Sequence, residues 1–375
     1  MKKQTQCVHS GNYVDLSSGG INTPIFTSSA FRYLDSDKQP YPRYFNTPNQ
    51  EVVVEKLTAL EQAEDGLLCS SGMAAISTAI LTIAGSGDHI ILQDELYGGT
   101  YAFATQQFTR LGINFSFVPK DCAAIEKAIT EKTRIILIET PTNPLLGIID
   151  IEQVAELARK KGIITIIDST FASPINQNPL NFGIDVVVHS GTKYLGGHSD
   201  ICCGAILTSK KLTEKMKTTA ADFGGSLNGE TCALLERSLK TLHLRVTKQT
   251  ENAAIIAQSL FDNELIGPVY YPGLKSHPGH AVAARQMAGF GAMLSFELSQ
   301  KIESTYEFLK RLELIVPALS LGGVETTICA PAQTSHLKMS PEDRKKIGIS
   351  ERLLRLSVGI EHPDDVLADL KQALS

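Results

Sequence analysis

The sequence contains no C-x-x-C pair and no H-E-x-x-H run, so it offers neither a zinc ribbon nor a helical zinc site. It has no apolar run of about 18 residues that could cross a bilayer, and residues 1–15 lack the apolar core of a signal peptide. It also has no long basic run, and its formal net charge of -5 argues against a nucleic-acid surface. We therefore expect a cytoplasmic protein that binds no metal, no membrane and no nucleic acid.

Length and patterning predict more than one structural unit. The 375 residues exceed what one compact core usually needs. Residues 1–45 are rich in Ser, Gly, Pro and Asn, which predicts an extended arm that lies on another surface. Residues 46–245 alternate short β-branched runs with amphipathic helices, the pattern of a mainly parallel sheet covered on both faces. One unbroken helix is expected over 228–261, and residues 246–375 predict a smaller C-terminal α/β domain.

Polar residues follow several predicted strands at the point where ligands bind in open α/β sheets, outside the carboxyl ends of the strands. Glu139 and Asn143 follow one strand, and Asp168 and Thr170 follow another. Lys193 lies in "HSGTKYLGG", directly after the apolar run "DVVVH". The stretch "CSSGMAA" begins a predicted helix, whose free N–H groups suit a phosphate. Each residue alone could be a helix cap or a solvated side chain, but together they predict one site.

An acid, an amide, a lysine and an anion site at one sheet edge suit pyridoxal phosphate (PLP). In that chemistry the lysine forms an imine with the aldehyde of the cofactor, and an aspartate keeps the pyridine nitrogen protonated. The protonated ring can then draw electron density from a carbanion, while hydroxyls and amides hold the phosphate. We interpret the hydroxyls and the lysine of "HSGTK" in this way.

The motifs also carry a resemblance that covers roughly residues 20–372. "SSGMAA", "LYGGTY", "ETPTNP", "DSTFASP", "HSGTKYLGGHSD", "SLGGVET" and "LRLSVGIE" occur in the order found in the Cys/Met-metabolism PLP enzymes. That family includes cystathionine γ-synthase, the cystathionine lyases and methionine γ-lyase. The resemblance implies an aspartate-aminotransferase-like fold (fold type I), with a mainly parallel sheet in the large domain, an extended N-terminal arm and a smaller C-terminal α/β domain.

For the cofactor, the resemblance implies that Lys193 forms the Schiff base and later moves protons. Asp168 pairs with the pyridine nitrogen, and Tyr97 stacks on the ring and helps to move a proton to or from the leaving group. These three residues are the expected catalytic set. Backbone N–H groups, hydroxyls and an amide supply the remaining expected contacts, from Gly72, Met73, Asn143, Thr170, Ser190 and Thr192.

For the substrate, the resemblance implies that Arg355 and Ser320 hold the α-carboxylate as a bidentate pair. Tyr41 and Arg43 match the "Y-x-R" of the family, which reaches the phosphate of a neighbouring subunit, so a homotetramer built from two active-site-sharing dimers is expected. Around them the chain has "YPRYFNTPNQ" where much of the family has "Y-S-R-x-x-N-P-T", which is a departure in the arm.

Two apolar positions bear on substrate choice. Relatives that act on cystathionine often carry Glu and Arg at the positions of Leu319 and Ala102. Both positions are apolar in this chain, as they are in methionine γ-lyases. Gly99 instead matches the cystathionine branch, because methionine γ-lyases usually have Cys there. We expect a carbon–sulfur lyase that eliminates the γ-substituent of methionine or homocysteine to 2-oxobutanoate, ammonia and a thiol. The alternatives are cystathionine γ- or β-lyase, and γ-replacement by a cystathionine γ-synthase or an O-acylhomoserine sulfhydrylase.

The sequence disfavours two other classes of function. A PLP-binding protein without catalysis is disfavoured because Lys193, Asp168, Tyr97 and Arg355 are all present. A nicotinamide-dependent oxidoreductase would rest on "GSGDHI" at Gly85, but that stretch follows a helical run instead of a strand and lacks the third glycine.

Overall fold

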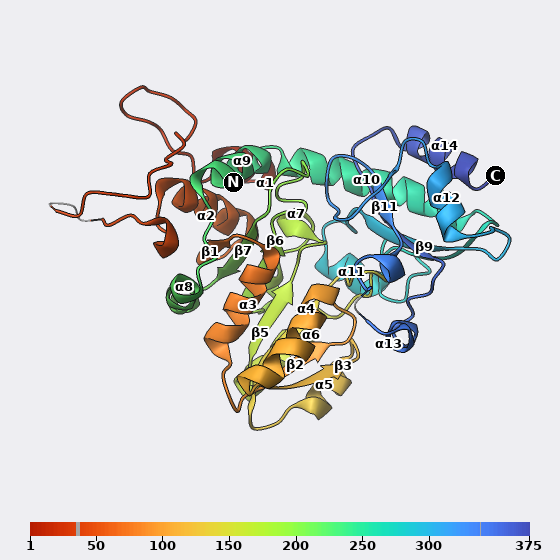
Figure 1. Ribbon diagram of the computed structural model, residues 1–375, viewed down its shortest axis with the longest axis horizontal. Coiled ribbons are helices and arrows are strands. Elements are labelled where there is room, and N and C mark those ends of the chain that lie inside the picture. The colour runs from red at the N-terminus through yellow and green to blue at the C-terminus, as the bar shows by residue number, and fades with distance from the viewer. Residues whose placement is uncertain (35–37, 338) are drawn as a thin grey trace.

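Two β-sheets, one of seven strands and one of five, organise the described residues in the computed structural model (Figure 1). The structure describes residues 1–34, 38–337 and 339–375. In these ranges no helix is both long and apolar enough to cross a membrane.

The larger sheet is mainly parallel, as predicted. Its order is β1-β7-β6-β5-β4-β2-β3, and every neighbouring pair from β6 to β3 is parallel. Strand β7 runs antiparallel to both of its neighbours, and the edge strand β1 was not predicted. The strands are β1 Asp65–Cys69, β2 His89–Gln93, β3 Asn114–Val118, β4 Thr133–Glu139, β5 Ile164–Asp168, β6 Val186–Ser190 and β7 Gly204–Thr208.

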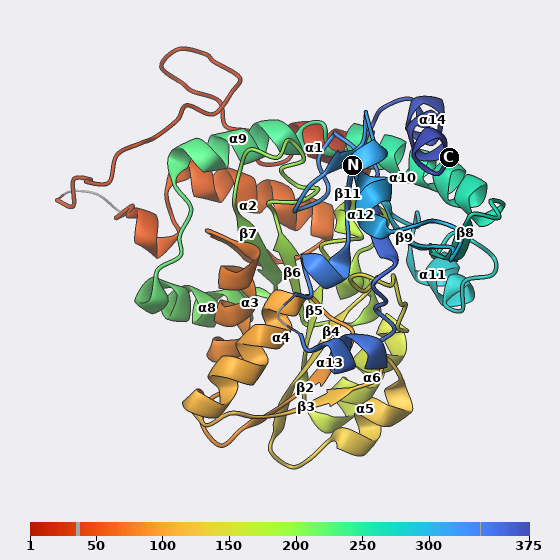
Figure 2. The ribbon, with the colours of Figure 1, turned by 45° about the vertical axis from the view of Figure 1, so that its right-hand side comes forward.

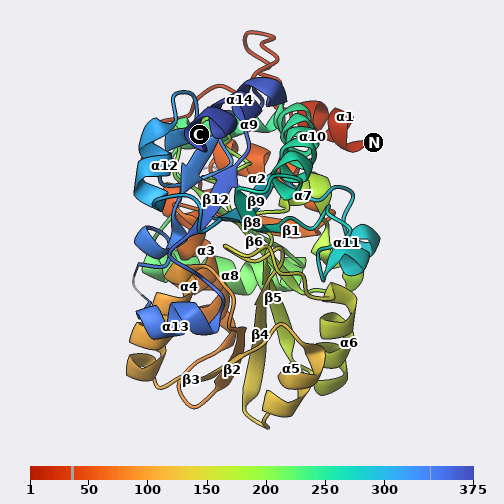
Figure 3. The same cartoon turned by 90° about the vertical axis from the view of Figure 1, so that its right-hand side faces the viewer.

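Helices cover both faces of this sheet (Figure 3), which is why its central strands β4 and β6 carry continuous apolar runs. Val186 and Val188 belong to the cluster that contains the buried face of α3, whereas Val187 between them belongs to the cluster of α6 and α2. The helices of this part are α2 Pro48–Glu61, α3 Gly72–Ile83, α4 Gly98–Phe103, α5 Cys122–Ala128, α6 Ile151–Lys161, α7 Ser173–Asn176, α8 Lys210–Phe223 and α9 Gly229–Leu239. Helix α4 continues through a π turn (Ala104–Phe108) and a 3-10 turn (Thr109–Leu111), and Pro179–Phe182 forms another 3-10 turn.

The single helix predicted over 228–261 is wrong, because the structure has α9 and then α10 Leu242–Phe261. The break lies at Lys240 and Thr241, where the N–H of Thr241 donates to Ser238 O instead of to a carbonyl four residues back. The guanidinium of Arg245 donates to the same Ser238 oxygen at 2.9 Å. A side chain from the first turn of α10 thus hydrogen-bonds the carbonyl at the end of α9, and no Gly or Pro is needed.

The smaller sheet has the order β10-β11-β12-β9-β8 and is antiparallel except for β10 and β11. Helices α10, α12 and α14 lie beside this sheet (Figure 2), and they contribute to the same apolar cluster as its strands. That cluster continues into the larger sheet. The strands are β8 Ile266–Tyr270, β9 Met293–Leu298, β10 Val316–Pro317, β11 Thr327–Cys329 and β12 Leu353–Ser357. The helices are α11 His280–Gln286, α12 Thr305–Arg311, α13 Pro341–Lys346 and α14 Pro363–Ala373, with a 3-10 turn at Pro331–Gln333. We propose domain limits of 46–245 and 246–375, with α10 crossing between them.

The N-terminal segment is only partly extended. Residues Lys3–His9 form the helix α1, which packs on α2 and α10. It is held because the buried Lys56 amine donates to the carbonyl oxygens of Cys7 and Ser10. Beyond α1, the segment forms no regular helix or strand in its described residues before the 3-10 turn Pro42–Tyr44, and Figure 1 shows it running out from the body of the molecule.

Candidate active site

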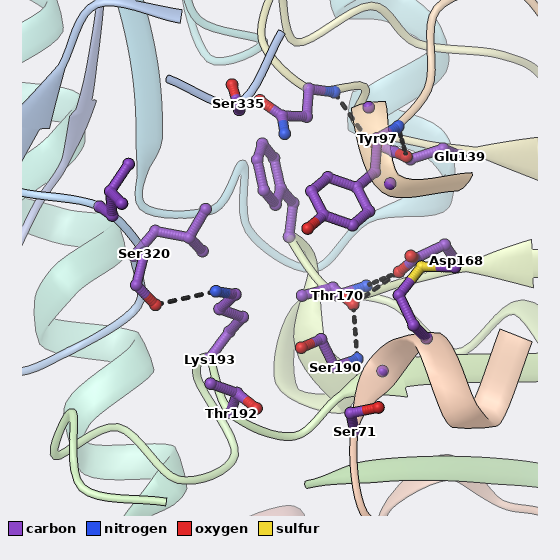
Figure 4. A pocket seen from close by; sticks show the side chains of 18 of the residues that line it. Ser71, Tyr97, Glu139, Asp168, Thr170, Ser190, Thr192, Lys193, Ser320 and Ser335 are labelled. Atoms are coloured by element: carbon purple, nitrogen blue, oxygen red, sulfur yellow. Dashed lines mark hydrogen bonds between the residues drawn. The ribbon is translucent and has the colours of Figure 1, made fainter. Parts of the chain in front are cut away.

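A cavity of about 470 Å³ lies between the carboxyl ends of the larger sheet and the smaller sheet (Figure 4). It brings together residues from both sheets and from the start of α3. The predicted residues that line it are Gly72, Met73, Tyr97, Asn143, Asp168, Thr170, Ser190, Thr192, Lys193, Leu319, Ser320 and Arg355.

Asp168 ends β5 and faces into the cavity (Figure 4). Its Oδ1 accepts hydrogen bonds from the backbone N–H (3.0 Å) and the hydroxyl (2.5 Å) of Thr170. The Thr170 hydroxyl oxygen in turn accepts from the N–H of Ser190 at 2.8 Å. Burial raises the pKa of Asp168, while the Thr170 bonds and the nearby Lys193 oppose that rise. A cationic ring nitrogen placed here would favour the ionised carboxylate.

Lys193 follows β6 in a tight turn, with its N–H donating to Ser190 O at 3.1 Å. Its amine points into the cavity and donates to Ser320 Oγ at 2.8 Å (Figure 4). Burial, and secondly the positive charge of Arg355, lower the pKa of Lys193. A larger neutral fraction makes this amine a better nucleophile towards an aldehyde.

The first turn of α3 forms an anion site. Ser71 caps the helix, accepting from Ala74 N at 3.1 Å, and the N–H groups of Gly72 and Met73 belong to the first helical turn, whose N–H groups have no partner within the helix. A Cβ at Gly72 would lie 2.7 Å from Ser190 Cβ, so only glycine lets the helix end reach the strand β6. The hydroxyl of Thr192 is engaged with the backbone of Cys203, donating to its oxygen at 3.2 Å and accepting from its nitrogen at 3.0 Å. Thr192 therefore lines the cavity with a hydroxyl that already has partners.

Arg355, on β12, supplies a cation that is only 4% exposed. It donates to Asn143 Oδ1 at 2.8 Å and to the backbone oxygen of Ser320 at 3.3 Å. Its Nε is buried and has no partner among the described residues. An unpaired guanidinium N–H in a cavity wall fits a carboxylate of the substrate.

Tyr97 and Gly99 form the opposite wall. The Tyr97 side chain is 40% exposed, and its ring lies against Gly99, where an added Cβ would overlap Cε1. Glu139 lies beside this wall, and its carboxyl oxygens accept hydrogen bonds from the N–H groups of Tyr97 (2.7 Å) and Asn143 (2.8 Å). Glu139 was noticed in the sequence as a strand-end residue but was not assigned to the site.

Other lining residues were missed altogether. Thr334 and Ser335 lie in an irregular segment beyond β11, and Cys202 lies beyond Lys193. No periodicity or strand end marks them in the sequence.

Three predicted residues lie outside the cavity of this chain. Ala102 sits one turn into α4 and does not line the cavity. Tyr41 and Arg43 lie on the arm, where the Arg43 guanidinium stands 5.6 Å from the Tyr41 ring centre and 5.5 Å from that of Tyr44. Arg43 also donates to Ala221 O at 2.8 Å. Their expected role in a neighbouring subunit stays a prediction.

A family model described as "Cys/Met metabolism PLP-dependent enzyme" matches residues 4–375. The chain belongs to this family. It is 42% identical to the "Cystathionine gamma-lyase" of Bacillus subtilis (strain 168), over 100% of this chain and 99% of that relative. It is 37% identical to an "L-methionine gamma-lyase" of Fusobacterium nucleatum subsp. nucleatum, again over 100% and 99% of the two chains. A crystal structure of cystathionine gamma-lyase from Lactobacillus plantarum, complexed with L-serine, matches with a TM-score of 0.96 at 39% identity, covering 100% of this chain and 98% of the other.

The cofactor of the family is PLP, and the residues of this cavity fit it. Asp168 would hold the pyridine nitrogen, the start of α3 with Ser190 would hold the phosphate, and Lys193 would hold the aldehyde carbon. Bound PLP supplies an electron sink for negative charge at the α-carbon of an amino acid. The glycine at position 72 and the buried, unpaired Nε of Arg355 are the observations that fit a phosphate and a substrate carboxylate.

Proposed function

We propose that the protein is a carbon–sulfur lyase that eliminates the γ-substituent of methionine- or homocysteine-type substrates. The products are 2-oxobutanoate, ammonia and a thiol. The observation that carries this choice is the charge of the cavity wall. Its charged side chains, among the described residues, are Glu139, Asp168, Lys193 and Arg355.

Each of these four charges has a partner or task close to the reacting end of the substrate. Arg355 takes the α-carboxylate, Asp168 and Lys193 serve the cofactor, and Glu139 is occupied by two backbone N–H groups. No further charged side chain of the described wall is left for a second ammonium and carboxylate, which cystathionine carries at its far end. Leaving such charges desolvated and unpaired costs several kcal/mol. A short apolar side chain avoids that cost.

Leu319 is the position that bears most directly on this choice. It lines the cavity and is 72% exposed, so a substrate side chain can reach it from the mouth. It has no polar atom with which to hold a distal ammonium. Ala102 no longer supports the same argument, because it lies outside the cavity wall.

The residues of the site have distinct tasks in this reaction. Arg355 orients the substrate through its carboxylate, helped by Asn143 and the backbone of Ser320. Lys193, whose amine lies between Ser320 and the cofactor site, removes the proton from the α-carbon. Tyr97 stands opposite and donates a proton to the departing sulfur.

A second candidate is elimination from cystathionine. The printed name of the Bacillus subtilis relative, at 42% identity, favours it, and so does Gly99, which matches that branch. In that case the distal end of the substrate would be bound outside the described wall, for instance by Arg32 of the arm.

Product analysis tests the proposal. The holoenzyme would be given methionine, homocysteine, cystathionine, cysteine and O-acetylhomoserine separately, and the keto acids separated by chromatography. We expect 2-oxobutanoate from methionine and homocysteine, together with the matching thiol. The proposal would be contradicted if methionine released no thiol and the enzyme instead formed pyruvate from cystathionine. It would equally be contradicted if methionine released no thiol and the enzyme formed a thioether from O-acetylhomoserine and an added thiol.

A further inference from the structure

Glu139 is buried where two segments of the site meet. It is the last residue of β4, is 5% exposed, and lies in register with Asp168 on the neighbouring strand. Unlike Asp168, Glu139 accepts a hydrogen bond from a backbone N–H group on each of its two carboxyl oxygens. Oε2 accepts from the N–H of Tyr97 at 2.7 Å (Figure 4), and Oε1 accepts from the N–H of Asn143 at 2.8 Å.

The chemistry of these two bonds is specific to a carboxylate. An ionised carboxylate has two acceptor oxygens and no donor, so it can accept from two converging N–H groups at once. A glutamine could accept from one of them but would turn its NH₂ group towards the other. Charge-assisted bonds of this kind are also shorter and stronger than neutral ones.

The two anchored segments carry different parts of the site. Tyr97 begins α4, and its ring forms one wall of the cavity. Asn143 accepts from Arg355, which binds Ser320, and Ser320 Oγ accepts from Lys193. Glu139 therefore joins the ring that stacks on the cofactor to the group that holds the substrate carboxylate.

A buried position beside Asp168 is unfavourable for a carboxyl group, which suggests that the carboxyl group of Glu139 has a specific role. Burial and the neighbouring Asp168 raise the pKa of Glu139 well above its usual value, and the two backbone N–H bonds and Arg355 counteract only part of that rise. The geometry, in which both oxygens accept, is that of the ionised form. A fold that needed only to fill this space would do so with an apolar side chain, which has no desolvation penalty.

We propose that Glu139 is a positioning residue that fixes the Tyr97 ring and the Asn143–Arg355 pair relative to each other. Cofactor stacking and carboxylate binding then depend on one anchor. The inference needs the PLP site alone and holds for any of the sulfur amino acids considered above.

Glu139→Gln tests it in the holoenzyme, with Glu139→Asp as a second variant that keeps the charge but shortens the reach to one donor. The matched control is Glu95→Gln. Glu95 is a nearby carboxylate that contacts Thr142 and Lys120 and none of the residues anchored by Glu139. The readouts are the visible circular dichroism of bound PLP, the dissociation constant of PLP, and kcat and KM for the best substrate.

We expect both Glu139 variants to fold, to change the visible circular dichroism, and to lose at least about tenfold in kcat/KM, with a rise in KM from the loosened Arg355. The Glu95 variant should resemble the wild type in all readouts. Wild-type dichroism and kinetics in either Glu139 variant would overturn the proposal. So would failure of both variants to fold, since the residue would then be structural. The dichroism needs no substrate, so it separates this inference from the choice of sulfur amino acid.

Discussion

The surroundings of Lys193 lower the pKa of its side-chain amine. Burial and the positive charge of Arg355 lower the pKa of this amine, while Asp168 acts in the opposite direction. A lysine with a lowered pKa is neutral over a wider pH range, and only the neutral amine attacks an aldehyde. Uptake of PLP by the apoprotein should therefore proceed at a lower pH than the reaction of PLP with an ordinary lysine.

This can be measured as the rate of PLP uptake against pH. We expect the rate to rise with a midpoint below the usual lysine pKa, and Arg355→Met to move that midpoint upwards because a like charge is removed. Borohydride reduction followed by peptide mapping should label Lys193. A midpoint at or above the usual value, or label on another lysine, would count against the assignment.

Gly99 has a steric task at the same scale. Its missing Cβ leaves room for the Tyr97 ring, so Gly99→Ala should push the ring away from the cofactor. The Tyr97 ring is 40% exposed and can turn aside, and enzymes with Cys at this position accommodate a Cβ, so we expect a loss of about three- to tenfold in kcat/KM, less than the hundredfold that a displacement of ~1 Å can cost. Gly85→Ala is the control, since a Cβ there meets nothing within 4 Å. A fully active Gly99→Ala enzyme with unchanged PLP absorbance would disprove the steric argument.

The sequence could predict the residues whose role depends on their own side chain at a strand end. Asp168 and Lys193 follow apolar runs directly, and the structure puts both in the cavity. Glu139 could not be assigned to the site from the sequence, because its partners are backbone N–H groups. Every residue but proline has such a group, so no sequence motif marks them. Thr334 and Ser335 could not be assigned either, because an irregular segment brings them to the cavity. The arm residues Tyr41 and Arg43 remain outside it.

At the scale of elements, Arg245 joins α10 to the turn that carries Lys193. It is 5% exposed and donates to the oxygens of Tyr194 (2.9 Å), Leu195 (3.4 Å) and Ser238 (2.9 Å). This clamp also explains why helical periodicity could not reveal the break between α9 and α10. The carbonyl of Ser238 accepts a hydrogen bond from the Arg245 side chain, and the spacing of apolar residues in the sequence does not reveal such a bond.

Arg245→Leu should therefore destabilise the fold. Each buried carbonyl left unpaired costs about 1–3 kcal/mol, so we expect a loss of several kcal/mol in the free energy of unfolding by urea. PLP should also dissociate faster, because the turn after β6 loosens. Arg237→Leu, on the exposed side of α9, is the control and should change stability by less than about 0.5 kcal/mol. Equal stability of the two variants would refute the clamp.

At the scale of the whole molecule, the arm bears on assembly. Tyr41 is 40% and Tyr44 50% exposed, and the Arg43 guanidinium lies near both rings, so the segment presents an aromatic and cationic surface outside its own cavity. We propose that it reaches the phosphate site of a neighbouring subunit in a homotetramer of two active-site-sharing dimers.

Mixing two inactive variants tests the sharing. In a mixed dimer of Arg43→Ala and Lys193→Ala chains, one site would contain Lys193 from the first chain and Arg43 from the second, and would be intact. We expect activity to return on mixing, up to about a quarter of the wild type when random exchange makes half of the dimers mixed. Absence of recovery, despite subunit exchange shown by mass spectrometry, would mean that each site is built from one chain.

The substrate preference is tested most directly by kcat/KM for L-methionine and L-cystathionine on one preparation, because this ratio compares the binding of the two transition states. We predict that methionine is preferred and that Leu319→Glu shifts the ratio towards cystathionine by about tenfold or more, whereas Leu319→Gln shifts it less. A wild-type enzyme that prefers cystathionine, with a ratio that Leu319→Glu leaves unchanged, would contradict the account.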